Sequence, residues 1–241
     1  MDMSIYITGD THGEVEALLK RKEKIADTLT ENDKIIVCGD FGFVFRYNKV
    51  NGHYTDEWKL DKLKELFPCE ILFISGNHEN FDRLYALHDE KRYGGTVKKV
   101  RNGIYLLKRG ELYEIEGKTF FTFGGAYSVD RPFRTENYTW WPQELPSPEE
   151  YQHAIKNLQK YSHIDYIITH TCPQRIIHWM GKSVNTHDAE LTGFFDWIFD
   201  SDFKQWYFGH WHLDKGFYND IIIACYENVY CLDETPQTTD N

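Results

Sequence analysis

The sequence has 241 residues, 41% of them hydrophobic and 16% aromatic, so it is long and apolar enough to fold around a core and is not a disordered chain. Its 27 basic and 38 acidic residues give a net charge of −11, which argues against binding to long duplex nucleic acid or to an anionic membrane. No apolar run of membrane-spanning length and no signal sequence occurs, and the five cysteines lack the spacing of a disulfide framework or a zinc ribbon. We therefore expect a cytoplasmic protein.

The first third of the chain alternates between strand-like and helical patterns. Apolar, β-branched runs predict strands at Ser4–Thr8, Lys34–Cys38 and Glu70–Ser75. Helical patterns follow each of them, at Glu14–Thr28, Thr55–Phe67 and Phe81–His88. This order is typical of a βαβαβ unit, in which the strands are parallel.

The middle of the chain has a different character. Four short strand-like runs, separated by turns that contain glycine, predict an antiparallel meander at Thr96–Val100, Gly103–Leu107, Glu111–Ile115 and Thr119–Phe123. The stretch from Tyr127 to Pro148 is polar and aromatic and has no clear period. A loop of this length in a compact domain is usually a lid or a binding segment.

The last third returns to alternating elements. Ser147 and Pro148 predict a capped start for a helix at Glu149–Tyr161. Further elements are expected as a strand at Tyr166–Thr169, a helix at Asp188–Asp200, a strand at Gln205–Phe208, and an antiparallel pair at Ile221–Cys225 and Val229–Leu232. Because no repeat or linker interrupts the chain, we expect a single mixed α/β domain over residues 1–232 and a polar tail at 233–241.

Five of the strand-like runs end in residues of the types that bind metal ions. These residues are Asp10 and His12, Asp40, Asn77 with His78 and Glu79, His170, and His210 with His212. Any one such motif is common in turns and helix caps, but five in order, each after a strand, are difficult to explain as turns. Ligands bind at the carboxyl ends of strands in open α/β sheets, so we expect one site built from five loops. Carboxylate, amide and imidazole ligands suit Mn²⁺, Fe or Zn²⁺ better than Ca²⁺, and their number exceeds the need of one ion.

The ordered motifs, from Asp10-x-His12 to Gly209-His210-x-His212, resemble those of the calcineurin-like metallophosphoesterase superfamily. The blocks Gly9–Gly13 and Gly76–Glu79 are most similar to the branch that contains the serine/threonine phosphoprotein phosphatases and their small bacterial and phage relatives. The resemblance implies a metallophosphoesterase-type sandwich of two mixed β-sheets flanked by helices. It also implies two divalent metal ions, with Mn²⁺ expected and Fe, Zn²⁺ or Ni²⁺ as alternatives.

The resemblance also implies a role for each matching residue. One metal ion would be held by Asp10, His12, Asp40 and His212. The other would be held by Asp40, Asn77, His170 and His210, so that Asp40 bridges the two ions. His78 is not a ligand in this family. It would lie over the site, orient the phosphate and protonate the leaving oxygen.

The sequence departs from the phosphoprotein phosphatase pattern after Asp40. In those enzymes an aspartate that supports the acid histidine and an arginine that binds phosphate follow, but here Phe43 and Val44 occupy those positions. Glu79 either supports His78 or is a surface or N-cap residue. We favour Arg131 and Arg134, in the loop, as replacements for that arginine, and Arg46, near Asp40, is a third candidate. The alternative for Arg131 and Arg134 is that they pair with Asp130 and Glu136. We expect Trp140 and Trp141 to pin the loop rather than to stack on substrate.

These residues predict phosphoester hydrolysis by a hydroxide that bridges two metal ions, with Asp40 and His78 as the central catalytic residues. Phosphomonoesters are favoured as substrates, on a phosphorylated small molecule or a phosphoprotein. A phosphodiesterase that acts on cyclic or linear nucleotides is the alternative. A non-catalytic metal-binding scaffold is a weaker hypothesis because every expected ligand is present. The sequence does not indicate a protein partner.

Overall fold

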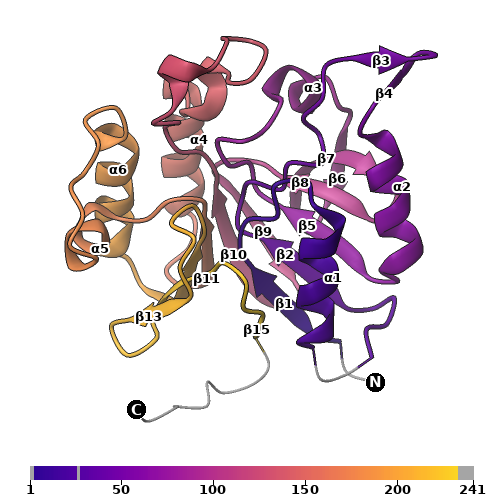
Figure 1. Ribbon diagram of the computed structural model, residues 1–241. Helices are drawn as coiled ribbons and strands as arrows, with labels where there is room; N and C mark the ends of the chain where they lie inside the picture. The colour runs from indigo at the N-terminus through magenta and orange to yellow at the C-terminus, as the bar shows by residue number, and fades with distance from the viewer. Residues whose placement is uncertain (1–2, 26–27, 233–241) are drawn as a thin grey trace.

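The computed structural model describes residues 3–25 and 28–232 and contains two large mixed sheets (Figure 1). The first sheet has the order β15 (Tyr230–Cys231), β1 (Ile5–Thr8), β2 (Lys34–Val37), β5 (Glu70–Phe73), β8 (Ile104–Leu107), β7 (Gly95–Arg101) and β6 (Asp89–Arg92). The second has the order β13 (Lys215–Phe217), β14 (Ile222–Ala224), β12 (Phe203–Phe208), β11 (Ile164–Thr169), β10 (Lys118–Phe123) and β9 (Glu111–Ile115). A small hairpin of β3 (Lys49–Val50) and β4 (His53–Tyr54) stands apart.

Helices cover the outer faces of the two sheets, as Figure 1 shows. The helices are α1 (Val15–Glu23), α2 (Glu57–Leu66), α3 (Phe81–Tyr85), α4 (Pro148–Leu158), α5 (Gln174–Trp179) and α6 (Ala189–Phe199). Helices α1 and α2 lie on the first sheet, whereas α5 and α6 lie on the second. The result is the single-domain, mixed α/β sandwich that the sequence predicted.

Alternation along the strands explains why both faces of each sheet are buried. Successive side chains of a strand point to opposite faces. Ile36 therefore packs between the two sheets, while its neighbours Ile35 and Val37 pack under the helices of the first sheet. In the second sheet, Phe120 faces the other sheet and Phe121 faces the helices. Continuous apolar strands of this kind are typical of parallel sheets that are covered on both sides.

The parallel βαβαβ start is confirmed, and its register places the ends of the strands level with one another. Thr8 of β1 pairs with Val37 of β2, which pairs with Phe73 of β5. In the second sheet, Thr169 of β11 is level with Phe208 of β12, and these strands are also parallel. The turns that follow the strands therefore emerge at one edge of each sheet.

Two predicted strand pairings are wrong. The expected meander is split, because β7 and β8 form a hairpin in the first sheet whereas β9 and β10 form one in the second. The expected antiparallel pair at the end of the chain is absent: β14 pairs with β12 and β13, and β15 crosses to β1. The Asp214 carboxylate accepts hydrogen bonds from three backbone N–H groups at residues 226–228 and holds the turn at which the chain changes sheets.

Helix boundaries are partly as expected. Helix α4 begins with a capping box between Ser147 and Glu150, as predicted from Ser147 and Pro148. Helix α1 ends at Glu23, earlier than the expected Thr28, and α3 ends at Tyr85 rather than at His88. Helix α5 and strands β3, β4, β6 and β13 were not predicted. The predicted tail at 233–241 lies outside the described residues. Among those that are described, no helix is long and apolar enough to cross a membrane.

Candidate metal centre

The five motifs meet at one place, between the carboxyl edges of the two sheets. Asp10 and His12 follow β1, Asp40 follows β2, and Asn77 follows β5. From the second sheet, His170 follows β11, and His210 and His212 follow β12. The two edges touch, because His170 Nε2 lies 3.4 Å from Asp40 Oδ1. The structure therefore brings all seven predicted metal ligands into one neighbourhood.

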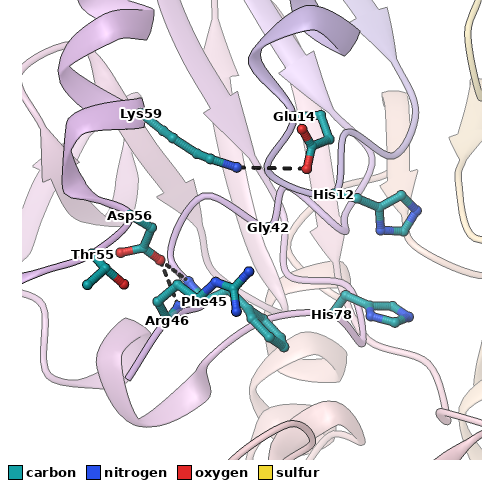
Figure 2. Close-up of a pocket in the computed structure, with 9 residues that line it drawn as sticks. All are labelled: His12, Glu14, Gly42, Phe45, Arg46, Thr55, Asp56, Lys59 and His78. Atoms are coloured by element: carbon teal, nitrogen blue, oxygen red, sulfur yellow. Dashed lines mark hydrogen bonds and ion pairs between the residues drawn. The ribbon is translucent and has the colours of Figure 1, made fainter. Parts of the chain in front are cut away.

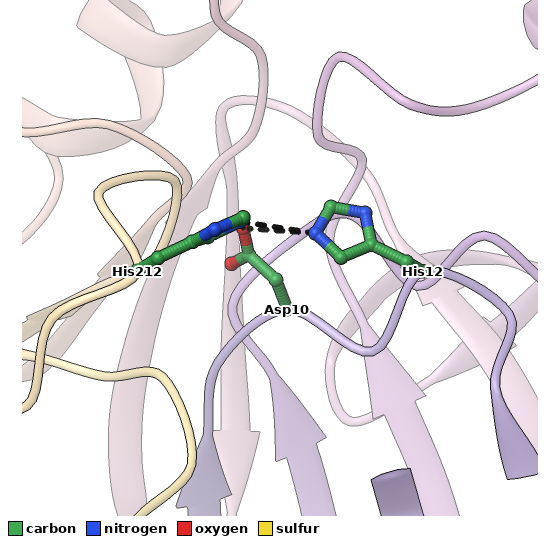
Figure 3. A group of neighbouring side chains, drawn as sticks. All are labelled: Asp10, His12 and His212. Atoms are coloured by element: carbon green, nitrogen blue, oxygen red, sulfur yellow. Dashed lines mark hydrogen bonds and ion pairs between the residues drawn. The ribbon is translucent and has the colours of Figure 1, made fainter.

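The first group consists of Asp10, His12 and His212 (Figure 3). The two imidazoles face each other, with 3.0 Å between their Nε2 atoms. The carboxylate oxygen Oδ2 of Asp10 lies 3.2 Å from His212 Nε2 and 3.9 Å from His12 Nε2. His12 also approaches the second group, since its Nδ1 is 3.8 Å from Asp40 Oδ2.

The second group surrounds Asp40 and is more deeply buried. His170 is fully buried, and its Nε2 lies 3.0 Å from Asn77 Oδ1. The other ring nitrogen, Nδ1, donates to the carbonyl of Cys38 at 2.8 Å, which fixes the tautomer that leaves Nε2 to face the site. The ring of His210 lies 5.0 Å from that of His170, measured between centroids. Asp40 stands between the two groups, 3.8 Å from His12 of the first and 3.4 Å from His170 of the second.

The backbone of the ligand turns is unusual. Asp40, His12, His210 and His212 all have positive φ values, between 45° and 66°. Side chains other than glycine rarely adopt this region, and such residues are concentrated at functional sites. Gly76 has a different reason to be glycine: a Cβ there would collide with the carboxylate and the backbone N of Asp40. These turns are shaped to place ligands and not only to reverse the chain.

Ionisation is strongly perturbed in the second group. Burial would raise the pKa of Asp40, but His170 beside it lowers that pKa well below its usual range. Burial would lower the pKa of His170, but the neighbouring Asp40 carboxylate outweighs burial and raises this pKa to about 10. Burial, with His170 as the next cause, lowers the pKa of His210 to about 4. Asp40 and His170 thus favour each other's charged forms, and a divalent cation bound at this group would take the place of a proton on His170.

The residues of both groups fit a pair of divalent cations. Asp10 Oδ2 is buried and has no hydrogen-bond donor in suitable geometry, which is a costly state for a carboxylate unless a cation balances it. Two imidazole nitrogens and this oxygen converge within 4.8 Å of one another, as do ligand atoms of Asp10, Asp40 and His170. Imidazole, carboxylate and amide ligands without thiolate suit Mn²⁺, Fe or Zn²⁺.

His78 lies beside the ligands, and an arginine from the distant loop reaches it. The His78 and His12 rings are 5.3 Å apart, and the backbone N–H of His78 donates to Asp40 Oδ1 at 2.7 Å. Arg134 Nη2 lies 3.0 Å from the ring nitrogens of His78, and the Arg134 guanidinium is paired with Asp130 at 2.8 Å. Burial, with Arg134 as a further cause and against the influence of Asp40, lowers the pKa of His78.

The other two arginine candidates lie elsewhere. Arg131 is paired at 3.1 Å with the fully buried Glu144, a partner that was not predicted, and stacks 4.2 Å from the Trp140 ring. Arg46 is exposed and lines a hollow beside the site. Trp141 is fully buried and donates from Nε1 to Asp82 at 2.9 Å, so it pins the loop as expected.

Sequence reasoning was wrong about one residue and missed another. Glu79 is neither a support for His78 nor a surface or N-cap residue: it is fully buried and accepts hydrogen bonds from the backbone N–H groups of Phe41 and Gly42. The N-cap of α3 is Asn80. Ser128 was not considered, yet its buried hydroxyl accepts from Asn77 Nδ2 at 3.0 Å. No local pattern identifies Ser128, because its partner is 51 residues away.

Comparison with known proteins decides the family. Residues 3–214 match the family described as calcineurin-like phosphoesterase. This chain belongs to the calcineurin-like phosphoesterases. No curated protein sequence matches it. Among solved structures, a phosphopantetheinyl hydrolase from Mycobacterium tuberculosis is similar, with a TM-score of 0.48 and 14% identity over 100% of this chain and 99% of the other.

The match to the calcineurin-like phosphoesterases covers every residue of both ligand groups, from Asp10 to His212. This family hydrolyses phosphoesters with a dinuclear metal site, and this member has candidate ligand groups at the expected positions. The chain is therefore a metal-dependent phosphoesterase, as the sequence predicted.

Proposed function

We propose that this calcineurin-like phosphoesterase is a phosphomonoesterase that uses Mn²⁺ and in which His78 protonates the leaving oxygen. The observation that carries the proposal is the position of Arg134, whose guanidinium lies 3.0 Å from the His78 ring. A phosphomonoester is a dianion with three terminal oxygens, whereas a diester is a monoanion with two. A cation beside the acid histidine favours the dianion.

Seven side chains would hold the two ions, in the arrangement that the sequence resemblance implies. One ion would bind Asp10, His12, Asp40 and His212, and the other would bind Asp40, Asn77, His170 and His210. Ions held in this way supply positive charge to the phosphate and lower the pKa of an attacking water. The low pKa of Asp40 and the burial of Asp10 Oδ2 among imidazole nitrogens support this arrangement.

Arg134 and His78 would act on the two sides of the breaking P–O bond. The guanidinium of Arg134, held by Asp130, binds terminal phosphate oxygens through its planar fork. His78 transfers a proton to the ester oxygen as that oxygen leaves with the bonding electrons. A bound phosphate dianion next to His78 also opposes the lowering of its pKa, because a neighbouring negative charge stabilises the imidazolium.

A phosphodiesterase is the second candidate, and one observation favours it. Two hollows, one of about 380 Å³ and one of about 450 Å³, both have His12 in their lining. A phosphodiester has an organic group on each side of its phosphorus and would use both hollows. A monoester needs only one.

The test is hydrolysis of p-nitrophenyl phosphate and bis(p-nitrophenyl) phosphate by the Mn²⁺-loaded protein, with Asp40→Asn as the blank. We expect the wild type to prefer the monoester. Arg134→Ala should lower kcat/KM for the monoester by about tenfold to hundredfold, the worth of a hydrogen bond to a charged group, and should reduce the preference. Arg175→Ala is the matched control, because Arg175 makes a comparable pair with Asp196 between α5 and α6.

The outcomes separate the two candidates. A preference of the wild type for the diester would overturn the monoester proposal and support the second candidate. Equal loss of monoester activity in Arg134→Ala and Arg175→Ala would remove Arg134 from the phosphate site. Full activity of His78→Ala would remove His78 as the acid.

A further inference from the structure

The hollow of about 380 Å³ beside the metal centre is lined by two basic side chains, Arg46 and Lys59, and by two acidic ones, Glu14 and Asp56 (Figure 2). His12 and His78 line it where it meets the metal centre, and Phe45, Arg46 and Lys59 line it further out. Its volume falls within the range of small-molecule sites, about 300–1,000 Å³. The hollow is therefore large enough for the organic part of a substrate whose phosphate lies at the metals.

Arg46 presents a guanidinium that the described residues leave free. The hydrogen bonds that these residues make with Arg46 involve only its backbone: its N–H donates to Asp56 at 2.7 Å, and its carbonyl accepts from Arg83 at 2.5 Å. Figure 2 shows its side chain directed into the same space as Lys59 and His78. A fixed backbone under a free guanidinium is a suitable arrangement for binding a ligand.

The acidic residues of the hollow do not neutralise Arg46. The Asp56 carboxylate accepts from Arg83 at 2.8 Å and from two backbone N–H groups, so its charge is already balanced. Glu14 lies 3.8 Å from Lys59. Lys59 donates to the carbonyl of Gly13 at 2.6 Å and has further N–H donors for a ligand, because an ammonium has three.

We propose that Arg46, assisted by Lys59, binds a second anionic group on the leaving part of the substrate. The substrate is then an organic phosphate that carries a further phosphate or carboxylate group. This inference rests on the proposed function: if His78 protonates the leaving oxygen, the leaving group departs into the hollow that His78 lines. Phe45 supplies an apolar wall for the carbon chain between the two anionic groups.

The net charge of the protein gives an anionic substrate no long-range attraction, so a doubly anionic ligand depends on donors inside the hollow. At a net charge of −11, the protein repels an anionic substrate at long range. A ligand with two anionic groups is repelled more than one with a single group. Specific guanidinium and ammonium donors at its second group offset this repulsion at short range.

The test compares substrates that differ only in the second group. The Mn²⁺-loaded protein is assayed with an alkyl phosphate, the alkanediol bisphosphate of the same chain length and the corresponding ω-carboxyalkyl phosphate. We expect kcat/KM to be about tenfold higher for one or both of the doubly anionic substrates, mostly through a lower KM. Arg46→Gln should lower this ratio about tenfold, and Arg46→Lys should retain part of it.

Lys62→Ala is the matched control, because Lys62 lies on α2 with Lys59 but is paired with Glu65 at 2.8 Å. In Lys62→Ala, the ratio of kcat/KM between the doubly anionic substrates and the alkyl phosphate should equal that of the wild type. Comparison of kcat/KM for the bisphosphate and for the ω-carboxyalkyl phosphate shows whether phosphate or carboxylate is preferred as the second group. Equal kcat/KM for all three substrates, or a ratio that Arg46→Gln leaves unchanged, would overturn the inference while the phosphomonoesterase proposal stands. If the protein hydrolyses none of these three monoesters but does hydrolyse bis(p-nitrophenyl) phosphate, the proposed function itself is overturned.

Discussion

The hydroxyl of Ser128 holds the side chain of Asn77, a proposed metal ligand, and its removal tests how the site is assembled. Ser128 Oγ accepts a hydrogen bond of 3.0 Å from Asn77 Nδ2, which turns the amide oxygen Oδ1 toward His170 and the site. Both residues are buried, so water cannot replace the hydroxyl. In Ser128→Ala, the amide nitrogen loses its partner, and the flipped amide that presents nitrogen to the metal becomes nearly as stable as the native one.

The size of the effect follows from the cost of an unpaired buried N–H group. This cost is about 1–3 kcal/mol, and residues that orient metal ligands typically contribute about tenfold to hundredfold in metal affinity. We therefore expect Ser128→Ala to weaken Mn²⁺ binding at one of the two sites by that factor. At a fixed excess of Mn²⁺, the stabilisation of the folded protein by metal then falls by about 1.4–2.7 kcal/mol.

Isothermal titration of Mn²⁺ into chelator-treated protein measures the affinity, and thermal unfolding with and without Mn²⁺ measures the stabilisation. Ser147→Ala is the control: it removes the N-cap of α4 and should lower stability by about 1 kcal/mol without changing Mn²⁺ affinity. If Ser128→Ala binds Mn²⁺ as tightly as the wild type while Asn77→Ala does not, the hydrogen bond has no orienting role and the reasoning is refuted.

Three further substitutions test other contacts of the site. Gly76→Ala should weaken Mn²⁺ binding by at least about tenfold, because the added Cβ displaces the Asp40 carboxylate; unchanged titration would contradict this. Glu79→Ala should lower the free energy of unfolding by about 2–3 kcal/mol in chemical denaturation, because two backbone N–H groups lose their acceptor, and Glu79→Gln should restore most of it. Trp141→Phe removes the hydrogen bond to Asp82 and should speed amide hydrogen exchange across residues 127–148; equal exchange rates would show that the bond does not anchor the loop.

The convergence of the metal-binding motifs was predictable from the sequence because it follows from strand topology. Each candidate ligand follows a strand that the sequence marks by its apolar run, and parallel strands place their carboxyl ends at one edge. Asp40 and His170 are 130 residues apart in sequence, but each needs only its own strand to reach the site. The chemistry of the ligands was also visible, since residue type alone separates a carboxylate and imidazole set from a thiolate set.

The strand pairings that went wrong depend on contacts between distant segments. The runs that form β8 and β9 are separated by a short turn, so local pattern favours a hairpin, yet they belong to different sheets. Partners elsewhere in the chain separate them: β8 pairs with β5 in the first sheet, whereas β9 pairs with β10, which pairs with β11 in the second. The strand β15 similarly pairs with β1, at the other end of the chain. Alternation of apolar residues shows that a strand is buried but not which strand lies beside it.

In the proposed site, the loop at 127–148 supplies the phosphate-binding cation that the segment after Asp40 lacks. Phe43 and Val44 stand where the related phosphatases have their aspartate and arginine, and both are buried in the core of the first sheet, where they cannot reach a phosphate. In the proposed site, Arg134 supplies the cation instead. Because Arg134 is carried by a loop and the metal ligands by strand ends, substitutions in the loop should change substrate preference and leave metal binding intact, with one exception.

That exception is Ser128, which belongs to the loop and contacts Asn77, a proposed metal ligand. The same loop is held to the core by Arg109, which is buried and donates to the carbonyls of Gly124, Gln143 and Glu144. Loosening the loop at Arg109 would therefore disturb Arg134 and Ser128 together, and with them both phosphate binding and the orientation of Asn77. If Arg134 binds phosphate and Asn77 binds a metal ion, as proposed, this one short segment couples substrate recognition to metal binding, because it contacts His78 at one point and Asn77 at another.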